Sequence, residues 1–133
     1  MPGERDLATL VASMDPGSRP DPYVLVTVDD VAALGDLVPD ATIREDEGLT
    51  VVVPQADADR LGLSYDFVAA WITLRVHSAL EAVGLTAAFS AVLAEAGLSC
   101  NVLAGYHHDH LLVPWEDRDA AIAALRALSA EGA

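Results

Sequence analysis

Two stretches of the chain, 60 residues apart, end a predicted strand in the same way. ValValProGlnAlaAsp at 52–57 aligns with LeuValProTrpGluAsp at 112–117. In both, an apolar run meets a proline and acidic residues follow, a pattern typical of a strand that ends where a helix begins. The order of predicted elements agrees across this offset: strand, helix, hairpin, helix. The repeat predicts an α+β fold of two βαββα units, with antiparallel sheet and helices on one face.

The first unit is predicted to be truncated. We expect residues 1–64 to hold an N-terminal helix and this first unit, and residues 65–133 to hold the second. Residues 23–28 (YVLVTV) are typical of a short buried strand. Asp30 is a candidate cap for a helix of little more than one turn, where the second unit has a full helix. GluAspGluGly at 45–48 predicts the tip of a hairpin.

The second unit opens with a clear two-residue alternation. Ala70, Ile72, Leu74 and Val76 alternate with Trp71, Thr73, Arg75 and His77, which predicts a strand with one apolar face. The mixed face would either meet solvent or form a dimer seam. An amphipathic helix ending at Gly97, strands at 100–106 and 110–113, and a last helix complete the unit.

Charge and cysteine content exclude several classes of function. Seven basic and 21 acidic residues give a net charge of −14, which repels nucleic acid and anionic membranes. The chain has a single cysteine, Cys100, which excludes an intramolecular disulfide and a multi-cysteine zinc site. Because Cys100 lies in an apolar run, we expect it to be a small buried residue. No signal peptide or membrane-spanning run is visible, so we expect a cytoplasmic protein.

Residues 81–103 (EAVGLTAAFSAVLAEAGLSCNVL) resemble the core of an ACT domain. Three runs taken together, WITLRVHSALEAVGLTAAFS, AGYHHDHLLVP and REDEGLTVVVP, resemble an uncharacterised bacterial family of tandem ACT-like proteins, from about residue 23 onward. The resemblance implies two ferredoxin-like units that act as a regulatory or sensing module, bind a small molecule such as an amino acid, and form a homodimer. It implies no enzyme activity and no cofactor.

The predicted ligand site lies at the start of the helix after Gly84. A helix N-terminus offers unpaired N–H groups to an anion, and a glycine lets a ligand approach the backbone. The amides at 85–87 could hold a carboxylate, and Asn101 could donate and accept hydrogen bonds. Glu81 or Asp30 could take an ammonium group. The predicted ligand-binding residues are Glu81, Val83, Gly84, Leu85, Thr86, Ala87 and Asn101. The same residues could equally serve only as a helix start and a loop.

HisHisAspHis at 107–110 allows a metal interpretation, with His107, His108 and His110 as candidate ligands. Neighbours on a strand face opposite ways, however, so these side chains do not converge unless a turn gathers them. Under the 60-residue offset, HisHis at 107–108 aligns with GluGly at 47–48. Both pairs would then lie at the tip of the corresponding hairpin of their unit. We therefore assign no metal and interpret the cluster as a polar turn, responsive to pH or lining a contact.

No nucleophile motif or phosphate-binding loop is present, so we assign no catalytic residue. Two other functions stay open beside the regulatory one. The first is a structural or protein–protein interaction module without a ligand, and the second, less favoured, is a metal-dependent enzyme.

Overall fold

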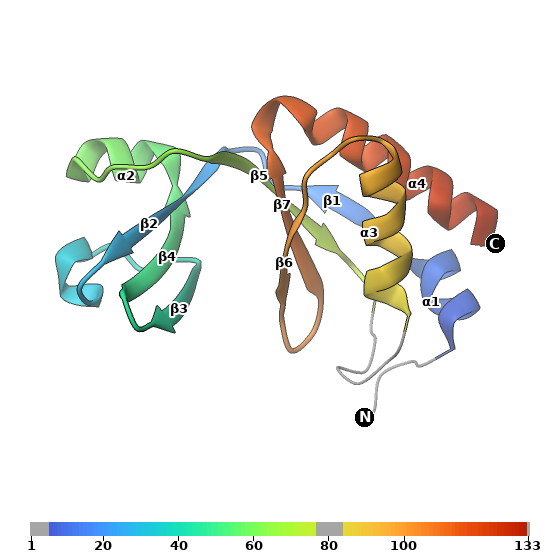
Figure 1. Cartoon of the computed structure of the whole chain (residues 1–133), viewed down its shortest axis with the longest axis horizontal. Coiled ribbons are helices and arrows are strands. Elements are labelled where there is room, and N and C mark those ends of the chain that lie inside the picture. Colours follow the sequence, from blue (N-terminus) through green and yellow to red (C-terminus); the bar gives the residue numbers. More distant parts are fainter. Residues whose placement is uncertain (1–5, 77–83, 133) are drawn as a thin grey trace. The chain divides into compact units, whose positions relative to one another are not determined.

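The computed structural model describes residues 6–76 and 84–132 (Figure 1). The chain divides into two compact units. Residues 20–69 form one, which we call the central unit, and residues 1–19 with 70–133 form the other, the terminal unit. The sequence predicts that the N-terminal helix belongs with residues up to 64, whereas in the structure this helix belongs to the terminal unit. The two divisions therefore differ mainly in this helix.

The central unit is a three-stranded antiparallel arrangement in the order β3-β4-β2, and the first two residues of β5 pair with β2. A single helical turn, η1, stands where the terminal unit has a full helix. Its elements are β2 (Tyr23–Val28), η1 (Val31–Leu34), β3 (Ala41–Glu45), β4 (Gly48–Pro54) and α2 (Gln55–Leu61).

Local signals explain the shape of the central unit. The Asp30 carboxylate accepts a hydrogen bond from the amide of Ala32 at 2.7 Å and caps η1, as predicted. Gly62 ends α2 in the left-handed conformation, at φ 70°. Alternate residues of β2 and β4 point into one apolar core, which consists of Val24, Val26, Leu34, Leu49, Val51, Val53 and Ala58.

The terminal unit contains the strands β5-β7-β6, and the short strand β1 pairs antiparallel with β5. Three helices, α1, α3 and α4, pack together beside this sheet (Figure 1). The elements are α1 (Leu7–Ser13), β1 (Pro16–Ser18), β5 (Val68–Leu74), α3 (Leu85–Glu95), β6 (Asn101–Ala104), β7 (Asp109–Pro114), η2 (Trp115–Asp117) and α4 (Arg118–Gly132). Both units thus follow the predicted α+β plan.

The core of the terminal unit follows from the periodicities in the sequence. Ala70, Ile72 and Leu74 of β5 are fully buried with Leu111 and Val113 of β7 on the helix-covered face. From the helices, residues spaced three or four apart fill the same core, namely Leu10, Met14, Leu85, Phe89, Leu93, Ala121 and Leu125.

Strand β1 was not predicted, because Pro16 and Gly17 sit in a stretch of four prolines and glycines that reads as a turn. A proline is tolerated at the start of a strand that pairs on one side only. The predicted strand at 100–106 is shorter in the structure, because the hairpin turn already begins at Gly105, whose amide donates to the carbonyl of His108 at 2.9 Å. No helix in the described part of the chain is long and apolar enough to cross a membrane.

Candidate functional site

The predicted ligand loop leads into α3, whose N-cap is Gly84. Its φ of 101° is a conformation that L side chains rarely adopt, so glycine is required there. Among the described residues, no side chain caps the helix, whose first internal bond runs from the amide of Ala88 to the carbonyl of Gly84 at 2.8 Å. A helix N-terminus of this kind can bind a carboxylate, because its amides point outward and the helix dipole favours negative charge.

The residues of this turn differ in which of their groups a ligand can reach. Leu85 is 3% exposed and its side chain belongs to the core, so only its backbone is available. Thr86 and Ala87 are exposed. Helix α1 closes one side, because a Cβ added at Gly84 would lie 3.1 Å from a methyl carbon of Leu7. The loop is thus open toward Thr86 and Ala87 and covered toward α1.

Asn101 lies away from this turn. It begins β6, after the connection from the other end of α3 (Figure 1), and a helix of 11 residues is about 16 Å long. Its amide nitrogen is 3.5 Å from the carbonyl of Leu112, its cross-strand neighbour. Glu81 and Val83 lie outside the described residues, and Asp30 caps η1 in the central unit. The structure therefore brings Gly84, Leu85, Thr86 and Ala87 together but not Asn101.

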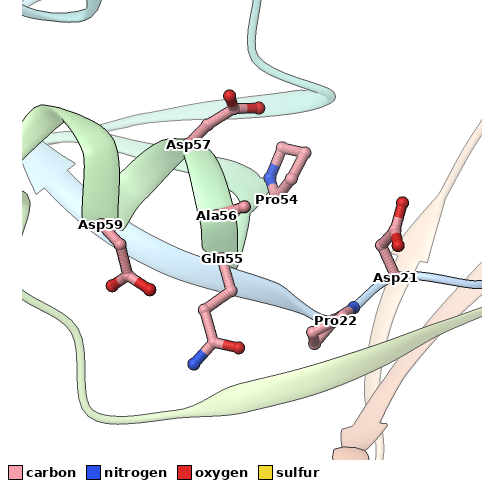
Figure 2. A pocket seen from close by; sticks show the side chains of 7 residues that line it. All are labelled: Asp21, Pro22, Pro54, Gln55, Ala56, Asp57 and Asp59. Atoms are coloured by element: carbon pink, nitrogen blue, oxygen red, sulfur yellow. The ribbon is translucent and has the colours of Figure 1, made fainter.

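The central unit has a pocket that the sequence analysis did not predict. It has a volume of about 400 Å³ and lies where the chain before β2 faces the start of α2 (Figure 2). Gln55 and Asp59 project from the same side of α2, and Tyr65 joins them: its hydroxyl accepts from Gln55 at 3.0 Å and donates to Asp59 at 2.7 Å. The lining residues are Asp21, Pro22, Pro54, Gln55, Ala56, Asp57 and Asp59.

The charge of this pocket suits a cationic group such as an ammonium, since three of its lining side chains are aspartates. In the sequence these residues fall in two segments more than 30 positions apart, and only the pairing of β2 with β4 brings Pro22 next to the end of β4. The one available signal was that each proline has an acidic residue nearby, Asp21 directly before Pro22 and Asp57 three residues after Pro54.

The histidine cluster occupies the tip of the β6–β7 hairpin, as the 60-residue offset predicted. His107 is exposed and stacks edge-on against Tyr106, with ring centroids 5.0 Å apart. His108 follows in the turn, and His110 is the second residue of β7. Within residues 6–76 and 84–132, no three histidine, cysteine or acidic side chains gather as a metal site requires. His77 lies outside these ranges.

His110 instead contacts the mixed face of β5. Its Nδ1 lies 3.2 Å from the indole nitrogen of Trp71 and 3.0 Å from the hydroxyl of Thr73. Trp71 is only 3% exposed and Thr73 9% exposed, so the expectation that this face meets solvent is wrong for both. The guanidinium of Arg19 stacks on the Trp71 ring at 3.9 Å. Arg19, the two β5 residues and His110 are far apart in sequence. The only sequence signal for the cluster was the alternation of Trp71 and Thr73 with the apolar residues of β5.

Comparison with known proteins identifies the family. Two models of the ACT domain match, one over residues 2–70 and one over residues 67–127. A Vibrio cholerae protein of unknown function, described as a possible transport protein, shares 45% identity, with 92% of this chain and 95% of that chain covered and a TM-score of 0.84. No curated protein matches the chain.

More distant solved structures share the fold. The ligand-free regulatory subunit of aspartate kinase from Thermus thermophilus is 12% identical, covers 88% of this chain and 98% of its own, and has a TM-score of 0.65. Aspartokinase III from E. coli, solved with aspartate and ADP, is 14% identical, covers 85% of this chain and 32% of its own, and has a TM-score of 0.62. The chain belongs to the ACT-domain family and carries two such domains in tandem.

Proposed function

We propose that this chain is a regulatory protein that binds a free amino acid. ACT domains are regulatory, ligand-binding modules, and the chain carries two of them. The fold is shared with the regulatory subunit of an aspartate kinase. The observation that carries the proposal is the first turn of α3, which no side chain of the described residues caps and which has a left-handed glycine before it and exposed residues on it.

The chemistry of that turn fits an α-carboxylate. Three successive amides, those of Leu85, Thr86 and Ala87, precede the first residue whose N–H is bonded within the helix. The Thr86 hydroxyl is exposed and can add one more donor. Glu81 and Val83, just before the turn, complete the proposed site, and Glu81 would take the ammonium group. Asn101, which the length of α3 separates from this turn, is left out of the proposed site.

The remaining parts of the proposal concern assembly and context. We propose a homodimer, as the family resemblance implies, a role without catalysis, and a cytoplasmic location. A net charge of −14 favours neither nucleic acid nor an anionic membrane as a partner.

A thermal-shift screen of the proteinogenic amino acids tests the proposal. A ligand that binds only the native state at 100 times its Kd stabilises it by about 2.7 kcal/mol, which raises Tm by several degrees for a domain of this size. We expect one amino acid, or a small group of related ones, to do so at millimolar concentration.

A matched pair of variants then tests the location of the site. Ala87 and Ala91 are both exposed, four residues apart on the same side of α3. Ala87→Glu places a carboxylate in the first turn, where it competes with a ligand carboxylate while stabilising the helix by about 0.3–1 kcal/mol. Ala91→Glu makes the same change of charge beyond that turn. We expect Ala87→Glu alone to weaken binding, and equal affinities would place the ligand elsewhere.

The alternative is an interaction module without a ligand. One observation favours it: Tyr106, at the tip of the β6–β7 hairpin, is 80% exposed, and aromatic side chains are common at protein contacts. The same screen separates the two functions, because an interaction module gains no stability from any amino acid.

A further inference from the structure

A second cluster of polar side chains lies in the terminal unit, apart from the first turn of α3. It joins Trp71 and Thr73 of β5 to His110 of β7, three residues that the sequence separates by up to 39 positions. Trp71 and Thr73 are at least nine-tenths buried. The planes of the Trp71 and His110 rings are tilted by 56°, with centroids 5.3 Å apart. The cluster is therefore compact, with Trp71 and Thr73 removed from solvent and His110 partly buried beside them.

The hydrogen bonds around Nδ1 of His110 depend on the protonation of the ring. The indole N–H of Trp71 lies 3.2 Å from two acceptors, Nδ1 of His110 and the hydroxyl oxygen of Thr73. That hydroxyl is 3.0 Å from Nδ1 and can donate to it or accept from it. In a neutral ring with its proton on Nε2, Nδ1 accepts from both Trp71 and Thr73. An imidazolium makes Nδ1 a donor, which keeps the contact with Thr73 but places two N–H groups 3.2 Å apart at Trp71. The geometry therefore favours neutral His110.

The hairpin tip is built around the other edge of the same ring. Gly105 has no side chain, and a Cβ added there would lie 3.0 Å from Nε2 of His110 and 2.8 Å from the carbonyl oxygen of His108. The turn closes here, because the Gly105 amide donates to that carbonyl at 2.9 Å. The His110 ring therefore lies between Trp71 and Thr73 of β5 and the backbone of the tip at Gly105.

The charged and titratable groups around His110 oppose its protonation. Burial is the largest influence that lowers its pKa, followed by the positive charges of Arg19 and His108. Arg19 stacks on Trp71, and Arg75 directly follows the last residue of β5. Strand β6 carries no titratable residue from 101 to 104.

The groups beside His110 in the hairpin do not offset this effect. The neighbouring Asp109 is half-buried, and burial raises the pKa of its carboxyl, which favours its neutral form. In the tip, His107 is exposed against Tyr106. The buried Nδ1 of His108 has no hydrogen-bond partner among the described residues.

We propose that His110 is a pH-sensitive latch that, while neutral, fastens the tip of the β6–β7 hairpin to Trp71 and Thr73 of β5, and that its protonation loosens the tip. The inference does not depend on the ligand proposed above, because it rests on residues of a different part of the terminal unit.

The direction of the pH effect follows from linkage. The pKa of His110 in the folded chain lies below its ordinary value of 6.5, so the unfolded chain binds this proton more readily. The contribution of the latch is then complete above pH 6.5 and is lost as the pH falls through the pKa of the folded state. Loosening of the tip should therefore begin in mildly acidic solution and not at neutral pH.

Trp71 reports directly on the latch. The chain has two tryptophans, so the Trp115→Phe chain isolates the fluorescence of Trp71. Between about pH 8 and 5, we expect one step in the Trp71 emission with a midpoint below 6.5. Adding His110→Asn keeps an acceptor near the position of Nδ1 but removes the titration, and should abolish the step. Adding His107→Asn, a change of the same kind at the exposed position, should leave the step intact.

A measurement on the unmodified chain guards against effects of the substitutions. The ¹⁵N chemical shifts of the imidazole nitrogens at pH 8 should show His110 with its proton on Nε2, and the indole N–H resonance of Trp71 should move with the titration of His110. A proton on Nδ1 would overturn the proposal. So would a Trp71 signal that does not change with pH, or a fluorescence step that persists in the His110→Asn chain.

Discussion

Replacing Leu10 by alanine tests how α1 is held. Leu10 is completely buried in the core of the terminal unit, which the helix shares with α3 and α4. At seven residues, α1 is far shorter than a helix that is stable alone in water, so its order must come from this packing. Removing the side chain therefore tests the assignment of the N-terminal helix to residues 70–133.

The expected cost is about 3 kcal/mol. Leu→Ala substitutions at buried sites cost about 2–5 kcal/mol, depending on how far the surroundings close the cavity. Leu10 packs between helices on one side of a sheet, where a short helix can shift inward, so a value in the lower half of that range is expected. If the helix undocks instead, the cost is bounded by what its docking contributes, and Val11 and Met14 become exposed as well.

Urea unfolding followed by tryptophan fluorescence measures the loss of stability in the terminal unit, where Leu10 lies. Trp71 and Trp115 both belong to the terminal unit and residues 20–69 contain no tryptophan, so the signal follows that unit alone. With an m-value of about 2 kcal/mol/M, a loss of about 3 kcal/mol lowers the midpoint by about 1.5 M urea.

Leu7→Ala is the matched control, because it makes the same change in the same helix at a side chain that is 41% exposed. It should cost less than about 1 kcal/mol. If Leu10→Ala shifts the midpoint no more than Leu7→Ala, then α1 does not pack on this core. The assignment of α1 to the terminal unit would then be wrong.

Two further predictions concern the same unit. The Ser129 hydroxyl of α4 lies 3.2 Å from the carbonyl of Ala12 and 3.1 Å from that of Met14, so Ser129→Ala should cost about 1 kcal/mol in the same urea assay; an unchanged midpoint would show that water replaces this bond. Burial raises the pKa of the Cys100 thiol, so Cys100 should be alkylated more slowly than free cysteine at pH 8. In denaturant, Cys100 should react as fast as free cysteine. Equal rates in the native chain would mean that the thiol is exposed.

Local patterns in the sequence were sufficient for much of the fold. The alternation along β5 identified the strand and its core face, because side chains on a strand alternate by necessity. GluAspGluGly identified the β3–β4 hairpin, and Gly62 ended α2 where a left-handed residue was needed. The 60-residue offset placed the histidines at a hairpin tip. Each of these inferences depends on residues close to one another in the chain.

The parts that were missed depend on contacts between distant residues. Nothing in the residues of α1 indicates that they pack against a helix more than 100 positions later, although the bonds from Ser129 link the two. The same holds for Trp71 and His110, whose hydrogen bond explains why the polar side of β5 is buried. In the ligand loop, the sequence identified the turn at Gly84 but also included Asn101, which the length of α3 separates from it.

The most direct test of the proposed function is to observe the backbone amides of the first turn of α3 while amino acids are added. In a two-dimensional ¹H–¹⁵N spectrum, the account predicts saturable shifts of Leu85, Thr86 and Ala87 with at least one amino acid at millimolar concentration. Shifts confined to Gln55 and Asp59 would move the ligand to the pocket of the central unit. The absence of any saturable shift with every amino acid would contradict the proposal that this protein senses one.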